Sequence, residues 1–532
     1  MNGHVFRVWA PEKERMFLHV LSPMDERLEM KREPGPEGYF SLEVPGAGPG
    51  TRYKFILDDG NEYPDPASHF QPEGVHGPSQ VVDHGRYAWK TLQWPQRPFR
   101  EWVLYELHVG TFTPEGTFAA VIARLDDLVD LGVNALEIMP VAAFPGACNW
   151  GYDGVYPYAV QESYGGPDGL KAFVDACHER GLAVVLDVVY NHLGPEGNHA
   201  ARFAPYFTGE YHTPWGDAVN LDGPWSGGAR DFILGNMHHW FRQYRVDALR
   251  LDAIHTIYDK SAMHFWEEAH ENLLEWRRDL GRELLLIAES DLNSPKVVTG
   301  TDVGGYGFDA QWLDDFHHAL YVLVDPKGKN HYEDFGRLEQ LAKAYNEGFV
   351  HSGEWTGFRR RRHGMSSAAV PCDRFVVFNQ NHDQAGNRAL GERLSALVDA
   401  DRLKVAAAAM LLSPYVPMLF MGEEYAEKAP FLFFIDYGDS DLSRRLQEGR
   451  KQEFAAFKWG EGEPADPSAE KTFLDSKLDW NLRNEGLHAE MLRWHKDLIT
   501  LRRTAPFLNP ARTGVTTELV PGGGLILRRH AE

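Results

Sequence analysis

Cysteine is scarce in this chain of 532 residues. Only Cys148, Cys177 and Cys372 occur, far apart and without a Cys-x-x-Cys pair. Such an odd, scattered set argues against a disulfide framework and against a zinc ribbon. A reducing compartment is therefore expected, and the protein is predicted to be cytoplasmic. The first residues fit this expectation because they lack the charged head and apolar stretch of a signal peptide.

Positive charge is also in short supply. Lysine and arginine total 54 against 77 aspartates and glutamates, which gives a net charge of −23. Nucleic acids and anionic membranes are bound through clustered lysine and arginine, so neither is expected as a partner. No stretch approaches the roughly 20 consecutive apolar residues that span a bilayer. The one dense basic run, residues 359–363, is interpreted first as a solvated loop or ion-paired patch and second as a substrate contact.

The N-terminal region, residues 1–92, predicts a β-sandwich. Short apolar runs at residues 5–10, 16–21 and 53–57 are separated by glycine, proline and aspartate. This is the pattern of strands joined by turns. A proline-rich stretch at residues 63–78 then predicts a linker to the next domain.

From residue 93 to residue 506 the pattern changes to strand, loop and helix. Eight candidate strands lie at residues 103–109, 135–140, 183–190, 246–252, 284–288, 308–313, 374–378 and 416–420. Alternation with helices indicates an α/β fold, and eight such units predict a (β/α)8 TIM barrel with long loop insertions. One helix is predicted over residues 117–131, with Thr117 as its N-cap and Gly132 as its stop. Residues 507–532 predict a short or truncated C-terminal β region.

Acidic and basic side chains follow four of these strands. The segments are Leu-Asp-Val-Val-Tyr-Asn-His (186–192), Val-Asp-Ala-Leu-Arg-Leu-Asp (246–252), Leu-Ile-Ala-Glu (286–289) and Asn-Gln-Asn-His-Asp (379–383). Charges are rarely buried unless they are paired or used in chemistry, and a (β/α)8 barrel carries its catalytic residues at the carboxyl ends of its strands. One such residue alone is usually a helix cap or an ion-pair partner, but four strand ends in this order predict an active site. Two carboxylates flanking one bond are typical of a glycosidase.

Three carboxylates are assigned roles from their positions. Arg250 and Asp252 are two apart on a strand and face the same side. A guanidinium there favours an ionised carboxylate, so Asp252 is the predicted nucleophile. Glu289 ends an apolar run whose desolvation raises its pKa, which predicts a proton donor that later acts as a base. Asp383 is expected to bind ring hydroxyls and to favour a distorted, oxocarbenium-like sugar, and Asp252 and Glu289 should lie roughly 5–6 Å apart.

These segments resemble the signature regions of the α-amylase family of retaining glycoside hydrolases, and the resemblance covers nearly the whole chain. Further stretches resemble those of the trehalose-releasing members, namely residues 71–79, 191–198, 312–318, 359–364 and 420–427. The resemblance implies a maltooligosyltrehalose substrate, hydrolysis of the α-1,4 bond next to its terminal trehalose unit, and trehalose as a product. A two-step mechanism would retain the anomeric configuration.

The resemblance also suggests which residues bind the substrate. Tyr152 matches a tyrosine that stacks under the sugar, and Asp314, Asp315 and His317 are candidates for contacts with the trehalose half. The full set expected to bind substrate is Tyr152, Asp187, His192, Arg250, His255, Asp314, Asp315, His317, His382 and Asn387. Asn191 matches a position that binds calcium in many amylases, but no acidic loop accompanies it, so neither a metal nor a cofactor is expected.

Two alternatives stay open at this point. A 1,4-α-glucan branching enzyme would use the same nucleophile and acid but would pass the sugar to another glucan instead of water. A non-catalytic glucan-binding barrel is a second alternative, against which the three carboxylates argue. A serine-triad hydrolase or a phosphate-binding barrel is disfavoured because the chain has neither Gly-x-Ser-x-Gly nor a P-loop.

Overall fold

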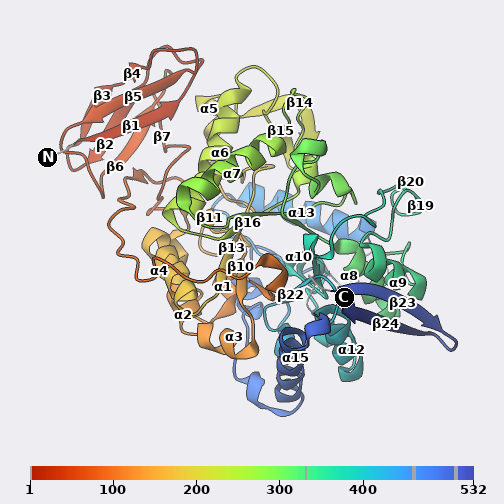
Figure 1. The fold of residues 1–532 in the computed structure, drawn as a ribbon. Coiled ribbons are helices and arrows are strands. Elements are labelled where there is room, and N and C mark those ends of the chain that lie inside the picture. The colour runs from red at the N-terminus through yellow and green to blue at the C-terminus, as the bar shows by residue number, and fades with distance from the viewer. Residues whose placement is uncertain (1–2, 330–331, 458–462, 509–512, 532) are drawn as a thin grey trace.

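The computed structural model describes residues 3–329, 332–457, 463–508 and 513–531. At its centre eight parallel strands close into a barrel, in which each strand pairs with the next one along the chain and the last pairs with the first (Figure 1). In chain order the strands are β9 (Leu104–Leu107), β10 (Ala135–Ile138), β13 (Ala183–Val188), β16 (Ala248–Leu251), β17 (Leu285–Ala288), β18 (Ala310–Trp312), β21 (Phe375–Phe378) and β22 (Val416–Phe420). All eight predicted barrel strands are confirmed, and so is the α/β barrel.

Side chains that alternate along these strands fill the barrel interior. Val185, Ala248 and Ile287 belong to one buried apolar cluster. In the register of β13 and β16, Val185 lies beside Ala248 and Asp187 lies beside Arg250. Because every second side chain faces the same side, Asp187 and Arg250 face the interior one layer nearer the carboxyl ends. The register therefore places polar groups at the mouth, on top of an apolar core.

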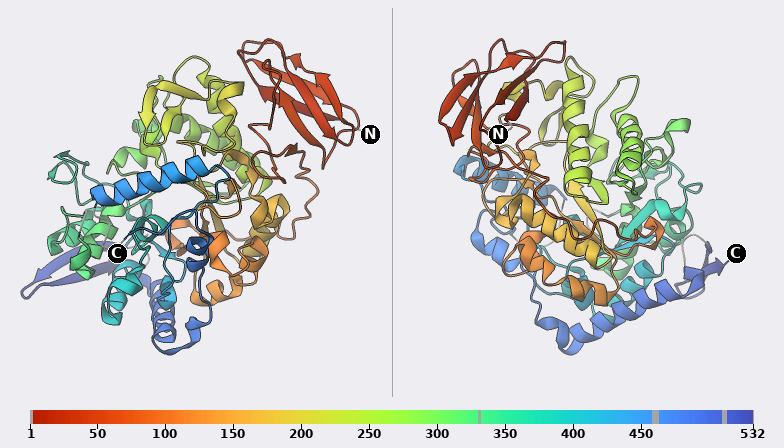
Figure 2. Two further views of the ribbon diagram at one scale, coloured as in Figure 1. Left: turned by 180° about the vertical axis from the view of Figure 1, so that it is seen from behind. Right: turned by 60° about the vertical axis from the view of Figure 1, so that its left-hand side comes forward.

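Helices surround the barrel on its outside (Figures 1 and 2). The longer ones are α4 (Gly166–Glu179), α6 (Ser226–Gln243), α7 (Phe265–Leu280), α8 (Asp314–Val324), α9 (Leu338–Glu347), α12 (Ala400–Leu411), α13 (Ser440–Phe457) and α15 (Gly486–Thr504). The shorter ones are α1 (Val109–Phe112), α2 (Phe118–Ile122), α3 (Leu125–Leu131), α5 (Ala200–Phe203), α10 (His382–Gly386), α11 (Leu394–Leu397) and α14 (Glu470–Asp475).

The prediction of one helix over residues 117–131 is wrong, because two helices, α2 and α3, occupy this stretch. Thr117 caps the first as expected, and the second ends at Gly132, whose φ is 102°. Between them the chain turns at Arg124, whose guanidinium carbon lies 4.5 Å from the centroid of the Trp480 ring. The break between α2 and α3 therefore coincides with a contact to a distant segment, which the local sequence pattern does not reveal.

Two antiparallel sheets precede the barrel and lie to one side of it (Figure 2). Their strands are β1 (His4–Trp9), β2 (Phe17–Ser22), β3 (Glu26–Glu29), β4 (Lys31–Arg32), β5 (Tyr39–Val44), β6 (Arg52–Ile56), β7 (Glu62–Tyr63) and β8 (Ser79–Gln80). Side chains of both sheets, Phe6 and Phe55 among them, form an apolar cluster with Phe203 and Tyr206 from a barrel loop. This cluster supports the predicted sandwich, while the domain boundary at residue 92 stays a prediction.

Shorter hairpins complete the fold. β11 (Ala142–Ala143) pairs with β12 (Tyr156–Val160), β14 (Phe207–Thr213) with β15 (Gly216–Val219), and β19 (Trp355–Thr356) with β20 (Arg361–Arg362). Near the C-terminus β23 (Thr513–Val520) pairs with β24 (Gly524–Ala531), so the strands expected there form one hairpin. The Asn346 amide of α9 donates to the Thr517 hydroxyl of this hairpin at 2.6 Å. Within the described ranges, no helix combines the length and apolarity needed to cross a membrane.

Candidate active site

A buried arginine, Arg250, connects the acidic side chains at the mouth of the barrel. Its side chain lies near the end of β16 and is inaccessible to solvent. Nη1 donates to both carboxylate oxygens of Asp187, at 2.9 and 3.0 Å, and to Oδ1 of Asp252 at 2.8 Å. Nη2 lies 3.8 Å from Oε2 of Glu289. One positive charge therefore gathers three of the predicted site residues.

Asp252 is held at both of its carboxylate oxygens. Oδ1 accepts from Arg250, and Oδ2 accepts from Nδ2 of Asn191 at 3.2 Å. The other end of the Asn191 amide, Oδ1, lies 3.0 Å from Nδ1 of His192, whose Nε2 lies 2.9 Å from the carbonyl oxygen of Tyr152. Asn191, considered above as a calcium position, therefore orients Asp252 and connects it to His192. A fixed orientation is what a nucleophile requires.

Glu289 follows β17 in surroundings that disfavour its charge. Burial raises its pKa, the Arg250 guanidinium acts against this rise, and the Asp252 carboxylate adds to it. The backbone N–H of Ala253 donates to Oε2 of Glu289 at 2.5 Å. Ala253 has a φ of 42°, a left-handed conformation that costs an alanine energy and that is found at functional sites. Because Oε2 accepts this bond, the proton of the neutral acid resides on Oε1.

A chain of hydrogen bonds connects Glu106, in β9, to Asp187. Nδ1 of His382 lies 2.5 Å from Oε1 of Glu106, and the His382 backbone N–H donates to Oε2 at 3.0 Å. Nε2 of His382 lies 2.8 Å from the Tyr152 hydroxyl, which donates to Asp187 at 2.5 Å. Burial lowers the pKa of His382, but the Asp383 and Glu106 carboxylates outweigh it, so that the pKa is raised to about 9. His382 is therefore an imidazolium at neutral pH and donates from both ring nitrogens.

Sequence reasoning missed Glu106. It occupies an inward-facing position of β9, two residues after Leu104, and is 1 % exposed. The available signal was a carboxylate inside the predicted strand at residues 103–109, since a charge in such a strand requires a partner. The partner, His382, could not be read from that strand.

Replacing Glu106 with glutamine should destabilise the protein in a pH-dependent way. Removal of one partner from a buried ion pair costs about 3–5 kcal/mol. The pKa of His382 rises from 6.5 to about 9 on folding, so the ion pair contributes fully below a pH of about 6.5 and its contribution is lost as the pH rises through about 9. The difference in Tm between wild type and Glu106→Gln should therefore narrow from about pH 6 to about pH 10 in scanning calorimetry. A constant difference over this range would contradict an imidazolium at His382.

Asp383 is the most exposed of the three catalytic candidates. Its side chain is 42 % accessible, against 12 % for Asp252 and 15 % for Glu289. Oδ1 of Asp383 accepts from Nδ2 of Asn387 at 3.1 Å and lies 3.5 Å from Nε2 of His382. Two neighbours therefore hold one oxygen of Asp383, and the accessible remainder is open to sugar hydroxyls.

The basic run at residues 359–363 meets the site through Arg359. Nη1 of Arg359 donates to Oδ2 of Asp291 at 2.8 Å, and Nε2 of His255 lies 3.7 Å from the other oxygen of the same carboxylate. The ion-paired interpretation of the run therefore holds for Arg359. The same residue lines a cavity with Asp291 and Asp314, so the run also borders the site.

Asp314 faces this cavity from the first turn of α8. Burial raises its pKa well above the ordinary value, and the neighbouring Glu289 and Asp383 carboxylates add to the rise. Asp314 is therefore favoured in its protonated form, which can donate a hydrogen bond to a sugar oxygen as well as accept one.

Asp315 lines the same cavity as Asp314, but one of its carboxylate oxygens binds the protein itself. Its Oδ2 accepts from the Asn293 side chain at 2.7 Å and from the backbone N–H groups of Val350 and His351 at 2.7 and 2.9 Å. The carboxylate therefore supports the loop at residues 350–351.

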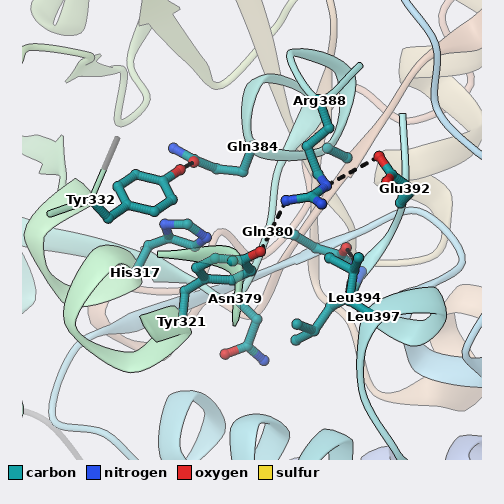
Figure 3. Close-up of a pocket in the computed structure, with 12 residues that line it drawn as sticks. His317, Tyr321, Tyr332, Asn379, Gln380, Gln384, Arg388, Glu392, Leu394 and Leu397 are labelled. Carbon is teal, nitrogen blue, oxygen red and sulfur yellow. Dashed lines mark hydrogen bonds and ion pairs between the residues drawn. The ribbon is translucent and has the colours of Figure 1, made fainter. Parts of the chain in front are cut away.

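His317 lies in a different cavity from Asp314. It lines that cavity with Tyr321 and Arg388, whose side chains Figure 3 shows near the His317 imidazole. Arg388 donates to the Tyr321 hydroxyl at 3.0 Å and to Glu392 at 3.2 Å. Neighbouring positions on a helix point in different directions, so His317 lines a different cavity from Asp314 and Asp315.

Comparisons with known proteins show the family of the chain. The family model of the alpha amylase catalytic domain matches residues 74–206. The malto-oligosyltrehalose trehalohydrolase of Saccharolobus solfataricus is 45 % identical over 502 residues, which cover 94 % of this chain and 85 % of that protein. The protein of the same name from Arthrobacter ramosus is 46 % identical over 510 residues, which cover 95 % and 88 %. The chain belongs to the malto-oligosyltrehalose trehalohydrolase family.

A solved structure agrees with this membership. The crystal structure assigned to an alpha amylase from Salmonella typhimurium has a TM-score of 0.89 and 42 % identity, and the match covers 97 % of this chain and 88 % of that one. The 1,4-alpha-glucan branching enzyme of Pseudoalteromonas atlantica is 30 % identical over 363 residues, which cover 59 % of this chain and 49 % of that protein. The branching enzyme therefore matches a smaller share of this chain than the malto-oligosyltrehalose trehalohydrolases do.

Substitutions of the adjacent residues Asp314 and Asp315 test whether the first binds substrate and the second supports the fold. Asp314→Ala should raise KM about tenfold, the effect of losing one substrate hydrogen bond worth about 1.4 kcal/mol, and should leave Tm within about 2 °C of wild type. Asp315→Asn should instead lower the free energy of unfolding by about 2–3 kcal/mol with little change in KM, since it weakens bonds to a buried charge. Steady-state kinetics and thermal denaturation check both variants. The reverse pattern would contradict the two roles.

Proposed function

We propose that this chain is a retaining glycoside hydrolase that cleaves the α-1,4-glucosidic bond next to the terminal trehalose of maltooligosyltrehalose. The products are trehalose and a maltooligosaccharide. The observation that carries the proposal is the placement of Asp252 and Glu289 around the Arg250 guanidinium at the carboxyl end of the barrel. Membership of the malto-oligosyltrehalose trehalohydrolase family supports the choice of substrate.

In the first step Asp252 attacks the anomeric carbon of the sugar that precedes trehalose. The bond from this carbon to the bridging oxygen breaks, and Glu289 transfers its Oε1 proton to that oxygen. Trehalose leaves as a neutral alcohol, and the maltooligosaccharide stays behind as an ester of Asp252. Oδ2 is the favoured attacking atom, because among the described residues its donor is the neutral Asn191 amide at 3.2 Å, whereas Oδ1 accepts from the charged Arg250 at 2.8 Å.

In the second step a water molecule replaces trehalose. Glu289, now a carboxylate, takes a proton from this water, whose oxygen attacks the anomeric carbon. The ester bond breaks, which restores the Asp252 carboxylate and the Glu289 acid. Two inversions give net retention, and the predicted separation of roughly 5–6 Å between the two carboxylates belongs to this mechanism. Carboxylates and water supply every proton and electron pair, so no cofactor is expected.

Asp383 and Tyr152 are proposed to prepare the sugar for these steps. The accessible part of Asp383 would bind ring hydroxyls and favour the distorted ring of the transition state. The Tyr152 ring would stack under the same sugar, and its hydroxyl is fixed between His382 and Asp187. Because its hydroxyl is held, the Tyr152 ring is in position before the substrate binds, which reduces the conformational entropy lost on binding.

We also propose three folding units, residues 1–92, 93–506 and 507–532, and a cytoplasmic location. The apolar cluster of the N-terminal sheets, which also includes Phe203 and Tyr206 of a barrel loop, is distinct from the cluster around the barrel, and this supports the first boundary. Free thiols at Cys148, Cys177 and Cys372 support a reducing compartment.

Product analysis on maltotriosyltrehalose tests the proposed function. We expect equal amounts of trehalose and maltotriose, with the α-anomer of maltotriose formed first in a proton NMR time course, and no new branch points in amylose. Branch points in amylose would instead support the branching enzyme. Glucan binding without any product would support the non-catalytic barrel.

A further inference from the structure

Three histidines from two distant parts of the chain meet outside the barrel. His69 lies between β7 and β8 and His84 follows β8, both in the segment at residues 64–103 that runs from β7 to the barrel, and His239 lies on α6. One ring nitrogen from each lies within 4.8 Å of the other two. We propose that His69, His84 and His239 bind a divalent transition-metal ion of the zinc type, which fastens this segment to α6.

The spacing of the first two rings already suits such an ion. Nδ1 of His69 and Nε2 of His84 lie 3.1 Å apart. Two nitrogens bound to one tetrahedral zinc, at bond lengths of about 2.0–2.1 Å, lie about 3.3 Å apart. The third imidazole needs to approach by no more than roughly 1.5 Å to complete the set. Side-chain rotation of one histidine covers that distance.

The hydrogen bond of His239 leaves one of its two ring nitrogens available. Its Nε2 lies 3.1 Å from the carbonyl oxygen of Tyr158. A carbonyl only accepts, so Nε2 carries the proton and Nδ1 keeps its lone pair. Histidines that bind metals usually donate their second ring N–H to a carbonyl or carboxylate in this way, which fixes the ring.

The protonation states of the three rings also match those of metal ligands. Burial lowers the pKa of His69 to about 4 and that of His84 to about 3, and it lowers the pKa of His239 as well. All three are neutral at pH 7, so each ring carries one proton. The ring that donates in the bond between His69 and His84 has only to move that proton to its other nitrogen to bind an ion.

Two buried polar atoms beside the cluster are left without partners. Among the described residues, Nδ1 of His84 and the hydroxyl of Tyr244 have no hydrogen bond. The Tyr244 ring contacts both His84 and His239, with centroid distances of 5.5 and 5.3 Å. A tetrahedral ion with three histidine ligands takes a water as its fourth ligand, and this water would give the Tyr244 hydroxyl a partner.

The positive charge of Lys171 lies beside the cluster, disfavours a bound cation and provides a second test. The Lys171 ammonium donates to the backbone carbonyl of His84 at 3.0 Å, and it contributes to the lowered pKa values of His69 and His84. Its charge repels a cation at the cluster. Replacing Lys171 with an uncharged side chain should therefore strengthen metal binding.

Equilibrium dialysis of the chelator-treated full chain against Zn²⁺ tests the proposal. We expect one tightly bound ion per chain, a Tm raised by several degrees, and Co²⁺ absorption bands of a four-coordinate site. His239→Gln should weaken Zn²⁺ binding at least about 100-fold, since it removes a ligand but keeps a donor for Tyr158. The control is His212→Gln, which removes an exposed histidine whose side chain is 74 % accessible and should bind as wild type does. Wild-type affinity in His239→Gln, or no stoichiometric ion in wild type, would overturn the proposal.

Lys171→Met keeps the proposal testable if His239→Gln does not fold. This variant should bind Zn²⁺ about tenfold more tightly than wild type, since a like charge beside the site is gone. Unchanged or weaker binding would overturn the placement of the ion among these three histidines.

Discussion

Asp252→Ala should abolish trehalose release and leave the fold in place. Removal of a nucleophile that forms a covalent intermediate lowers kcat by about 10⁴-fold or more. The buried Arg250 keeps its hydrogen bonds to Asp187 in this variant, at 2.9 and 3.0 Å, so its charge retains a partner. We therefore expect Tm to fall by no more than a few degrees. Trehalose assays and thermal denaturation measure the two effects separately.

Azide gives this prediction a positive control. The space left by the Asp252 side chain admits a small anion, which can attack the anomeric carbon from the same face while Glu289 still protonates the leaving trehalose. Asp252→Ala with azide should therefore restore trehalose release and form a maltooligosyl azide of inverted, β configuration, identified by NMR. Asp187→Ala is the matched control, because it removes the other partner of Arg250 but not the nucleophile. A β-azide from Asp187→Ala, or wild-type rates from Asp252→Ala, would sink the assignment.

The barrel could be predicted from the sequence because its strands are continuous apolar runs. Every residue of β13 is buried, as is every residue of β21. Such strands stand out against loops, and helices between them leave few alternatives to a closed parallel sheet. The site could be found for the same reason, since Asp187, Arg250 and Glu289 interrupt or end runs that are mostly apolar.

What the sequence did not reveal depends on contacts between distant segments. Glu106 meets His382 across 276 positions of the chain, and the carboxylate of Asp315 accepts from backbone groups 35 and 36 positions later. The break between α2 and α3 lies where Arg124 packs on Trp480. No local pattern encodes these partners, so a strand-end carboxylate and a supporting carboxylate look alike before the chain is folded.

Glu289→Gln should lower kcat/KM on maltotriosyltrehalose by about 10²–10⁴-fold, the usual contribution of a general acid. Glutamine preserves an acceptor for the Ala253 N–H but has no proton to give to the departing oxygen. The wild-type rate should fall as the pH rises through the pKa of Glu289, since the donor must be protonated, and burial, which raises this pKa, moves the fall to higher pH. This alkaline decline should be absent from the pH profile of the variant.

A substrate whose leaving group needs no proton allows the two steps of the mechanism to be measured separately in Glu289→Gln. The fluoride ion of α-maltosyl fluoride departs without protonation by an acid. Glu289→Gln should therefore still form the ester on Asp252. Breakdown of that ester requires a base to activate water, which glutamine cannot supply. We therefore expect a burst of fluoride equal to the enzyme concentration, followed by slow turnover, and a maltosyl group on the peptide that carries Asp252 in mass spectrometry. Asp252→Ala should give no burst, and an equal loss of activity on both substrates in Glu289→Gln would show that Glu289 does not deliver the proton.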